Sequence, residues 1–233
     1  MSLRFLKSRI SDVLALLYPE YCPGCDDALQ SSERVICTRC RFKLPRTKFI
    51  PKSGNQIEKL FWGKVNLEAA TAFLQFHKGA EVMNLLHELK YKGNQDVGEV
   101  LGRMFVSEYK KHDFFETIEA IVPVPLHVTK ERKRGYNQCD SICYGISDLT
   151  DIHTIRGALK RTRANATQTS KGRFERFTNT KQLFEVNDES IVGKHVLLVD
   201  DVVTTGSTLE ACIHPLLAKN CKVSVACMAA PID

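Results

Sequence analysis

Residues 196–208 read Val196-Leu-Leu-Val-Asp-Asp-Val-Val-Thr-Thr-Gly-Ser-Thr208, and they constrain the architecture more than any other segment. The apolar start is typical of a strand that is buried on both faces of a parallel sheet. Asp200 and Asp201 follow at the carboxyl end of this strand, which is the edge where open α/β sheets bind ligands. Hydroxyl residues and Gly206 then lead into a helix, so backbone N–H groups and a helix N-terminus converge and predict an anion site.

The predicted anion site combines two carboxylates with a hydroxyl-rich loop. Its candidate residues are Asp200, Asp201, Val202, Val203, Thr204, Thr205, Gly206, Ser207 and Thr208. Carboxylates belong beside an anion when the ligand is a sugar phosphate, because they accept from ribose hydroxyls or hold Mg²⁺. The alternative is that an Asp or Thr only caps the helix. One cap explains one residue of this set, which favours a binding site.

From about residue 68 the chain alternates between strand-like and helix-like segments. Short apolar runs predict strands at 70–76, 118–124, 182–186, 195–199 and 223–228. Apolar residues at helical spacing predict a helix at 81–91, and further helices are predicted at 96–110, 138–148 and 207–219. This alternation indicates an α/β fold in which a mainly parallel sheet is flanked by helices.

The composition is that of an ordinary globular protein, since 43% of the 233 residues are hydrophobic and 26% are charged. This length accommodates one α/β core and a small appendage. We therefore predict an N-terminal unit with a helix and a cysteine module at 1–50, a linker at 51–67 and the α/β domain at 68–233. Lys52-Ser-Gly-Asn55 supplies the turn signal of the linker.

No apolar run reaches the roughly 20 residues that cross a bilayer. Residues 2–17 resemble a targeting segment only superficially, because Arg9 and Asp12 interrupt the apolar positions, and an amphipathic helix is predicted there. The nine cysteines are odd in number and include two C-x2-C pairs, which suits a reducing compartment. We expect a cytoplasmic protein without a membrane span.

The formal net charge of +6 is spread unevenly. Residues 1–52 hold ten Lys/Arg against five Asp/Glu, and residues 128–176 hold eleven against five. Two basic zones suggest binding of phosphates, nucleic acid or both. A solvated surface is the alternative, and thiolates bound to a metal would cancel much of the excess in the first zone.

Four cysteines, in the pairs Cys22-x2-Cys25 and Cys37-x2-Cys40, have the spacing of a four-thiolate structural Zn²⁺ site. A closed Cys₄ shell leaves no open position for a substrate, so such a zinc ion stabilises structure. The short flanking segments cannot form a core alone, and metal ligation supplies the missing stability. A redox dithiol is the weaker alternative. The remaining five cysteines are predicted to be buried apolar residues, namely Cys139, Cys143, Cys212, Cys221 and Cys227.

Residues 130–138 read Lys-Glu-Arg-Lys-Arg-Gly-Tyr-Asn-Gln and follow the predicted strand that ends in Pro-Val-Pro. This loop should face the Asp200 loop across the same sheet edge, with His127 as a polar residue at the mouth. Arg132 and Arg134 are suited to bind a pyrophosphate by bidentate hydrogen bonds. The alternative is a solvated basic turn that precedes a helix. Residues 159–179 are polar and basic without apolar periodicity, which favours a lid, a binding loop or disorder, or else a nucleic-acid contact.

Residues 200–208 resemble the motif with which type I phosphoribosyltransferases bind phosphoribosyl pyrophosphate (PRPP). From about residue 18 to residue 230 the chain also resembles the ComF family of late competence proteins. The supporting motifs are the cysteine pairs after Tyr18-Pro19, Val122-Pro-Val-Pro-Leu126, Arg132-x-x-Gly-Tyr-Asn-Gln138, and Gln168 with Arg176-x-x-Asn179.

The resemblance implies a site for PRPP with Mg²⁺ in which Asp200, Asp201, Arg132 and Arg134 act in catalysis, the two arginines on the leaving pyrophosphate. It also implies lid or substrate contacts for Asn137, Gln138, Gln168, Arg176 and Asn179. ComF-like proteins are associated with DNA uptake and natural transformation, which implies single-stranded DNA and DNA-processing competence proteins as partners.

Three functions are compatible with these features: phosphoribosyl transfer, single-stranded DNA binding with a retained PRPP loop, and non-catalytic sensing of a phosphoribosyl ligand. All three use one fold, so the fold does not choose between them. Release of pyrophosphate would indicate the enzyme. Salt-sensitive binding of single strands would indicate the DNA module, and ligand binding without turnover would indicate the sensor.

Overall fold

The computed structural model describes residues 19–76, 81–162 and 183–231. The amphipathic helix predicted at 2–17 and the candidate residues Gln168, Arg176 and Asn179 lie outside these ranges. Within the described ranges, no helix has the length and apolar character needed to span a membrane.

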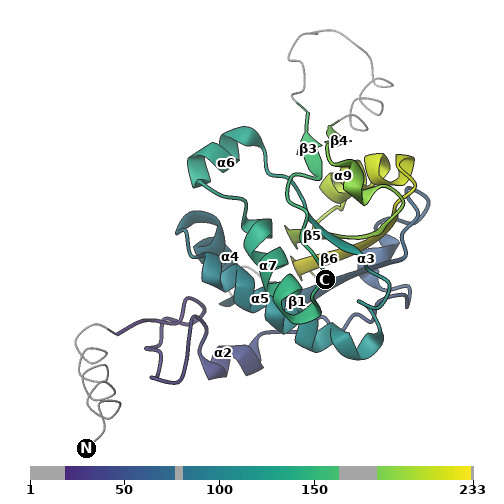
Figure 1. The fold of residues 1–233 in the computed structure, drawn as a ribbon. Helices are drawn as coiled ribbons and strands as arrows, with labels where there is room; N and C mark the ends of the chain where they lie inside the picture. Colours follow the sequence, from purple (N-terminus) through teal and green to yellow (C-terminus); the bar gives the residue numbers. More distant parts are fainter. Residues whose placement is uncertain (1–18, 77–80, 163–182, 232–233) are drawn as a thin grey trace, which may run out of the picture.

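A four-stranded parallel sheet forms the centre of the protein (Figure 1). In spatial order its strands are β1 (Ala69–Gln75), β6 (Lys222–Ala230), β5 (His195–Val202) and β2 (Ala120–Pro123). Val199 in β5 pairs with Pro123 in β2, so the two strands end beside each other. The two segments that were predicted to bind one ligand therefore leave the sheet side by side.

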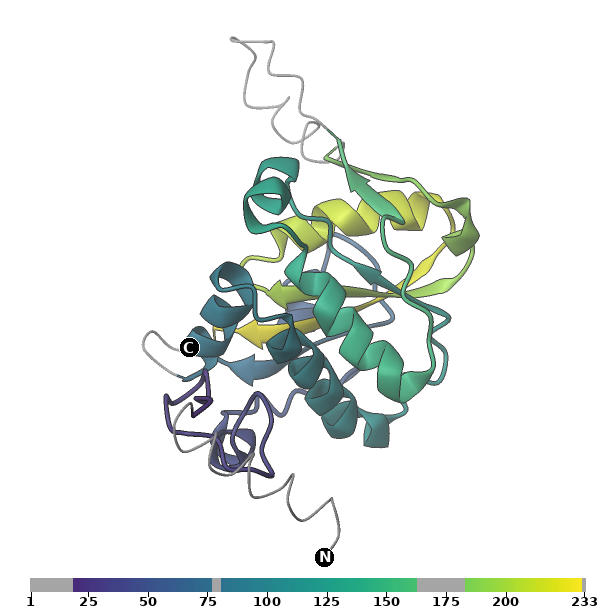
Figure 2. The ribbon, with the colours of Figure 1, turned by 60° about the vertical axis from the view of Figure 1, so that its left-hand side comes forward.

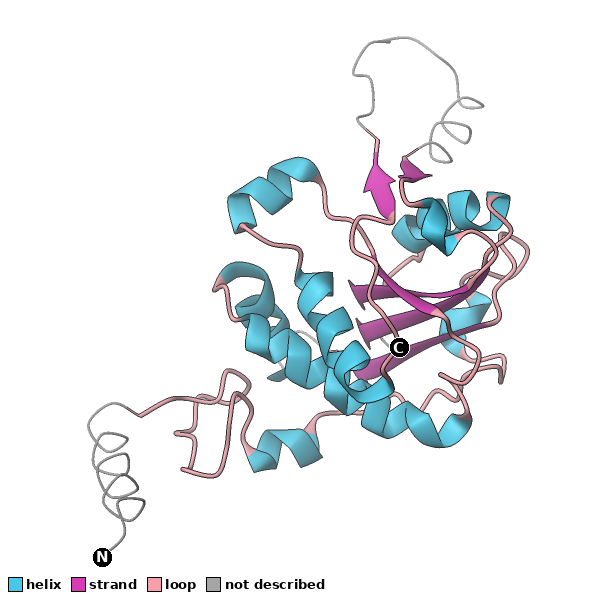
Figure 3. Cartoon of the chain, in the orientation of Figure 1, coloured by secondary structure: helices cyan, strands magenta, loops and turns pink. Residues whose placement is uncertain are grey.

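Helices cover both faces of this sheet (Figures 2 and 3). One face carries α4 (Glu81–Tyr91), α5 (Gln95–Tyr109) and α7 (Gln138–Thr150), and the other carries α3 (Gln56–Lys59) and α9 (Ser207–Ala218). Side chains alternate along β5, so Leu197 and Val199 join the core of the first face while Val196 and Leu198 join the second. The predicted α/β fold with a mainly parallel sheet is confirmed.

Several short elements were not predicted from the sequence. They are α2 (Thr38–Lys43), α6 (Val128–Arg134), β3 (Leu159–Arg161), which was expected as part of the 159–179 loop, and the 3₁₀ turns Lys110–His112 and Glu189–Ile191. β3 pairs antiparallel with β4 (Phe184–Val186), outside the main sheet. The loop prediction was wrong at 159–161 because Leu159 is buried there, in a strand too short to show periodicity.

The basic segment at 130–134 was also expected to be a loop and is helical. His127 caps α6, with Nδ1 accepting a hydrogen bond from Thr129 N at 3.3 Å. Gly135 ends the helix with a φ of 84°, a left-handed conformation that favours glycine. These two residues confine the helix to two turns, which is too short for an apolar face to reveal it.

Residues 51–67, expected as a linker, contain the capped helix α3. Asn55 Oδ1 accepts from Glu58 N at 3.2 Å, and Glu58 Oε2 accepts from Asn55 N at 3.1 Å, which makes a capping box. Ile57 and Phe61 are buried in the same core cluster as α9. This segment thus packs on the sheet, and the domain boundaries near 50 and 68 stay a prediction.

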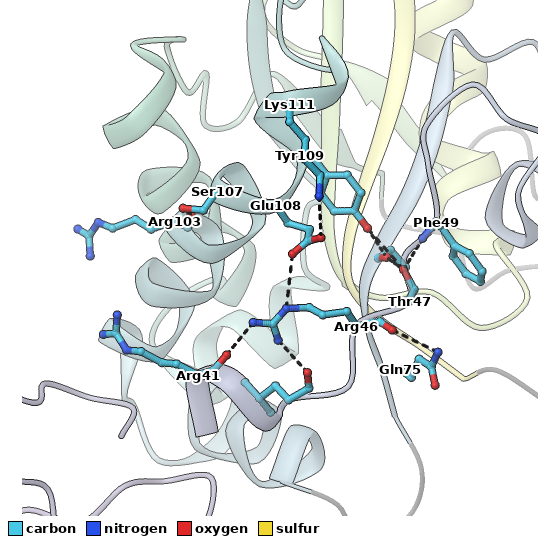
Figure 4. A network of polar contacts seen from close by, with 12 residues as sticks. Arg41, Arg46, Thr47, Phe49, Gln75, Arg103, Ser107, Glu108, Tyr109 and Lys111 are labelled. Carbon is cyan, nitrogen blue, oxygen red and sulfur yellow. Dashed lines mark hydrogen bonds and ion pairs between the residues drawn. The ribbon is translucent and has the colours of Figure 1, made fainter. Parts of the chain in front are cut away.

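The chain between the cysteine pairs and β1 is held by a polar network around Arg46 (Figure 4). The Arg46 guanidinium donates to Leu44 O at 2.9 Å and to Arg41 O at 2.7 Å. It also lies 3.7 Å from Glu108 Oε2 and covers the ring of Phe73, with 4.6 Å to the ring centroid. Arg46, counted in the N-terminal basic zone, therefore stabilises the fold.

Candidate functional site

A cavity of about 340 Å³ opens at the carboxyl ends of β5 and β2. It lies between the loop after β5 and the helix α6. Its lining residues are Lys90, Tyr91, Val124, Pro125, Leu126, His127, Lys130, Arg134, Gln138, Arg161, Asp200, Asp201, Val202, Thr204 and Thr208. The structure thus brings both halves of the predicted site into one space.

The loop after β5 forms a small hollow at the N-terminus of α9. This hollow measures about 40 Å³ and is lined by Asp200 and residues 202–209. Thr204, Thr205, Ser207 and Thr208 expose their side chains there, and the hydroxyls of Thr205 and Ser207 lie 2.9 Å apart. Exposed hydroxyls at the start of a twelve-residue helix suit a phosphate group.

Gly206 is the one residue of this loop whose type is dictated by the backbone and by its neighbours. Its φ is 77°, in the left-handed region that favours glycine. A Cβ at this position would lie 3.2 Å from the ring of Phe61. The segment predicted as a linker therefore supports the loop from behind.

The two carboxylates at the end of β5 are both buried, with 8% of Asp200 and 5% of Asp201 exposed. Asp200 Oδ1 accepts from Asp201 N at 2.8 Å and from Cys139 Sγ at 3.6 Å. Burial, together with the neighbouring Asp201 charge, raises the pKa of Asp200 to about 8. A buried pair of this kind resists carrying two charges unless a cation or hydroxyl donors join it.

Asp201 carries the clearest sign of a missing partner. Lys90 Nζ lies 3.0 Å from Asp201 Oδ2 as an ion pair, but the contact lacks hydrogen-bond geometry. Among the described residues, this oxygen is the one buried side-chain N or O atom without a hydrogen-bond partner. Carboxylate oxygens in this condition fit Mg²⁺ or ribose hydroxyls, which supply the absent contacts.

Arg134 faces the carboxylates across the cavity. It donates from Nη1 to Gln138 Oε1, and its guanidinium lies 5.5 Å from the centroid of the Tyr91 ring. These contacts hold a planar cation in the lining of the cavity that Asp200 and Asp201 also line. Arg134 and Gln138 thus both line the cavity, and their predicted roles toward a ligand stay a prediction.

Arg132 and Asn137 lie elsewhere. Arg132 is exposed on α6 and is absent from the lining of the 340 Å³ cavity, so its role stays a prediction. Asn137 is buried and caps α7, accepting from Cys139 N at 3.1 Å and donating to Val124 O at 3.0 Å. Both ends of the Asn137 side chain are thus used within the fold.

Sequence reasoning missed several residues of the site. They are Lys90, Tyr91, Lys130 and Arg161 in the cavity, and Cys139 beneath it. Ligand groups were sought in the loops after strands, whereas Lys90 and Tyr91 end a helix and Arg161 ends the short strand β3. The available signal was a lysine next to a tyrosine at the end of an amphipathic helix.

The four predicted metal ligands converge in space. The sulfur atoms of Cys22, Cys25, Cys37 and Cys40 all lie within 4.8 Å of one another, and the Cys25 and Cys37 sulfurs are 3.6 Å apart. Sulfurs around a tetrahedral Zn²⁺ at 2.3 Å are separated by roughly 3.8 Å, so the cluster fits such an ion. Backbone N–H groups of Cys37 and Cys40 point at Cys22 Sγ and Cys37 Sγ, at 3.3 and 3.4 Å.

We define residues 19–46 as the cysteine module, which packs against α4. Gly24 O accepts from Asn84 Nδ2 at 3.1 Å, and a Cβ on Gly24 would lie 3.7 Å from Leu85. Cys22, Cys37 and Cys40 belong to the same core cluster as α4 and α5. The module is therefore continuous with the core on one face of the sheet.

Residues 154–232 match the phosphoribosyl transferase domain family. Together with the parallel sheet, this match defines a protein that carries a phosphoribosyltransferase domain. The chain belongs to the ComF family, because its relatives over most of its length are competence and DNA utilization proteins.

Three relatives illustrate this membership. DNA utilization protein YhgH of Escherichia coli (strain K12) is 30% identical over 211 residues, which covers 89% of this chain and 88% of that protein. Competence protein F of Haemophilus influenzae is 34% identical over 215 residues, covering 85% and 90%. Competence protein ComFC of Bacillus subtilis (strain 168) is 27% identical over 140 residues, covering 60% and 55%.

Proposed function

We propose that the protein binds PRPP or another ribose 5-phosphate ligand together with Mg²⁺ at the carboxyl edge of the sheet. The observation that carries this proposal is Asp201 Oδ2, a buried carboxylate oxygen that has an ion pair with Lys90 at 3.0 Å but no hydrogen-bond partner among the described residues. It lies beside a hollow of about 40 Å³ that offers hydroxyls and a helix N-terminus to an anion. A ligand with a phosphate, ribose hydroxyls and a bound cation satisfies all of these groups at once.

Each part of the ligand has a matching part of the site. The 5-phosphate would occupy the loop from Thr204 to Thr208, and the ribose hydroxyls would face Asp200 and Asp201. A pyrophosphate would extend toward Arg134 and Lys130 on α6, with Arg132 as a further contact. Mg²⁺, when bound by the two carboxylates, supplies positive charge that neutralises the pyrophosphate oxygens.

We propose phosphoribosyl transfer as the reaction of this site. In such a reaction the bond between ribose and pyrophosphate breaks as the acceptor forms its own bond to the ribose. The residues on α6 would hold the leaving group, and the loop after β5 would hold the sugar. The reaction would therefore be accelerated mainly by positioning and charge stabilisation. A sensor that binds the ligand without turnover uses the same residues and differs only in releasing no pyrophosphate.

Calorimetry on the zinc-loaded protein tests the proposal directly. PRPP with Mg²⁺ should bind the wild type, and the double substitution Asp200→Asn/Asp201→Asn should weaken binding at least about 100-fold. Asp151→Asn is the matched control, because Asp151 is an exposed residue in the left-handed region that asparagine also adopts. Equal affinity of the double variant and the wild type would exclude this site.

We propose a structural Zn²⁺ for the cysteine module and the cytoplasm as the location. The supporting observations are the convergence of four sulfur atoms and the absence of disulfides among the nine cysteines, all of which lie in the described residues. A thiolate site and unpaired cysteines both suit a reducing compartment.

A role in DNA uptake, with single-stranded DNA as a second ligand, is supported by the names of the relatives and by one exposed aromatic residue. Phe42 on α2 is 85% exposed and is flanked by Arg41 and Lys43. Bases of a single strand stack on such rings. Arg41 Nε donates to Ile36 O at 3.2 Å, so one donor of this guanidinium is used within the fold. Binding of a labelled single strand at increasing salt tests this role.

A further inference from the structure

A second cavity, of about 330 Å³, adjoins the candidate phosphoribosyl site. It shares Lys90, Tyr91, Lys130 and Arg134 with that site, and it adds Lys133 and Tyr136. The lining that the structure describes contains four cationic side chains and no carboxylate. We call this cavity the basic pocket.

The basic charge of the pocket is largely uncompensated. Lys130, Lys133 and Arg134 are three and four residues apart on α6, so their side chains share one face of the helix. Lys130 and Lys133 are exposed, and neither forms an ion pair with a carboxylate of the described residues. Lys90 is the exception, since it pairs with Asp201 at 3.0 Å. Adjacent unpaired cations repel one another, and anionic ligands relieve this repulsion. A pyrophosphate on Lys130 and Arg134 would still leave Lys133, which lines only the basic pocket, without an anionic partner among the described residues.

The pocket also offers aromatic surface. Tyr91 is 70% exposed, and Arg134 and His87 lie near its ring, with 5.5 Å from Arg134 Cζ and 5.0 Å from the His87 ring to the ring centroid. Tyr136 is fixed by a hydrogen bond from its hydroxyl to Leu89 O. Tyr136 is half-buried, so the exposed ring of Tyr91, beside guanidinium and ammonium groups, is the one that offers stacking to a planar base, and the cations offer contacts to a phosphate.

We propose that the basic pocket binds a nucleotide unit, a phosphate with a stacked base, as a second ligand beside the phosphoribosyl ligand. Lys133 and Tyr136 line this pocket and not the candidate phosphoribosyl cavity, so the two spaces are adjacent without being identical. The volume lies at the lower end of the range for small-molecule sites, roughly 300–1,000 Å³, which suits one nucleotide. The inference rests on the proposed phosphoribosyl site, to which the pocket would present this second ligand.

The nucleotide unit has two sources with the same chemistry: a free nucleoside monophosphate, or the phosphorylated end of a single strand. The test titrates thymidine monophosphate and, separately, a short 5′-phosphorylated oligothymidylate into protein saturated with Mg²⁺ and PRPP. Lys133→Ala removes a cation that lines only the basic pocket. Lys110→Ala, an exposed lysine at the end of α5, is the charge-matched control. PRPP affinity is measured for every variant.

We expect at least one of the two probes to bind the PRPP-saturated wild type, and Lys133→Ala to weaken that binding about tenfold. PRPP affinity should stay within about twofold in both variants. Preference for the oligonucleotide identifies a strand end, and equal or better binding of the monophosphate identifies a free nucleotide.

The inference fails if PRPP binds but neither probe does, if a probe displaces PRPP one for one, or if Lys133→Ala and Lys110→Ala behave alike. One-for-one displacement would mean that the pocket is only part of the pyrophosphate site. Failure of the proposed function has a different signature, because PRPP itself would then not bind the wild type.

Discussion

The cysteine module and the carboxyl edge of the sheet both gather groups that repel one another, four thiolates in one case and two carboxylates in the other. In the module, the sulfurs converge within 4.8 Å, and backbone N–H groups of Cys37 and Cys40 already point at them. At the sheet edge, the Asp201 oxygen next to Lys90 lacks a hydrogen-bond partner. The sulfurs of the module form a closed set of four potential metal ligands, whereas the carboxylates at the sheet edge face an open cavity.

The two regions therefore differ in what they contribute to the ligand-free protein. A closed thiolate shell gains its full interaction energy when the metal binds, and that energy stabilises the fold. An open carboxylate pair is unfavourable until a ligand arrives, so it lowers the stability of the free protein in exchange for binding. Three substitutions, taken from the largest expected effect to the smallest, can contradict or refine this contrast.

Removing the metal from the module should have the largest effect. Cys37→Ala breaks the thiolate shell and leaves three thiols within the core cluster that includes α4. We expect the loss of bound zinc and a decrease in melting temperature of about 10 °C. Calorimetric melting and metal content measure both. Cys143→Ala, a buried cysteine outside the cluster of four sulfurs, should keep the metal and melt only slightly lower. Similar melting of the two variants would show that the module contributes little stability.

Gly206→Ala should have an intermediate effect. The new Cβ combines a φ of 77° with a contact of 3.2 Å to Phe61. We expect about 2 kcal/mol of destabilisation in urea unfolding, and weaker PRPP binding because the loop must shift. Gly193→Ala is the control, since Gly193 has a φ of 73° but a Cβ added there would meet no atom within 4 Å. If both variants lose equal stability, Phe61 does not support the loop.

Asp200→Asn should have the smallest effect on stability, and in the opposite direction. The amide oxygen keeps the hydrogen bonds from Asp201 N and Cys139 Sγ. Because burial raises the pKa of Asp200 to about 8, this carboxyl must take up a proton when the protein folds at neutral pH, whereas an amide needs none. We expect the ligand-free variant to gain about 1 kcal/mol in urea unfolding, whereas PRPP binding is lost. A loss of stability of similar size would mean that the carboxylate pair stabilises the free protein.

The sequence was sufficient for the central architecture because that architecture depends on local patterns. Buried positions can be recognised directly in the sequence, from the apolar run of β5, from the short apolar strands and from the helical spacing of Leu85 and Leu89. The cysteine pairs were equally clear, because thiolate spacing predicts the ligand set without any knowledge of the remaining chain.

The sequence was insufficient where an element is short or where the site is made by long-range contact. Two turns of α6 and three residues of β3 are too few for a period to appear. Lys90 was missed because its role depends on where the end of α4 meets the sheet, and Asp201 lies far from it along the chain. Cys139 was predicted to be buried, and it is, but its contact with Asp200 needs the packing of α7 on β5.

The position of β6 has a consequence for how the protein is made. This strand lies between β1 and β5, yet it follows both of them in the chain. Until the ribosome has produced residues 222–230, β1 has no partner strand in the sheet. Asp200 in β5 is likewise without Cys227, the residue opposite it in β6. Pairings between such distant segments form slowly. The ligand edge is therefore assembled late during synthesis, and a nascent chain that stalls before β6 exposes an unpaired apolar strand to chaperones or to aggregation.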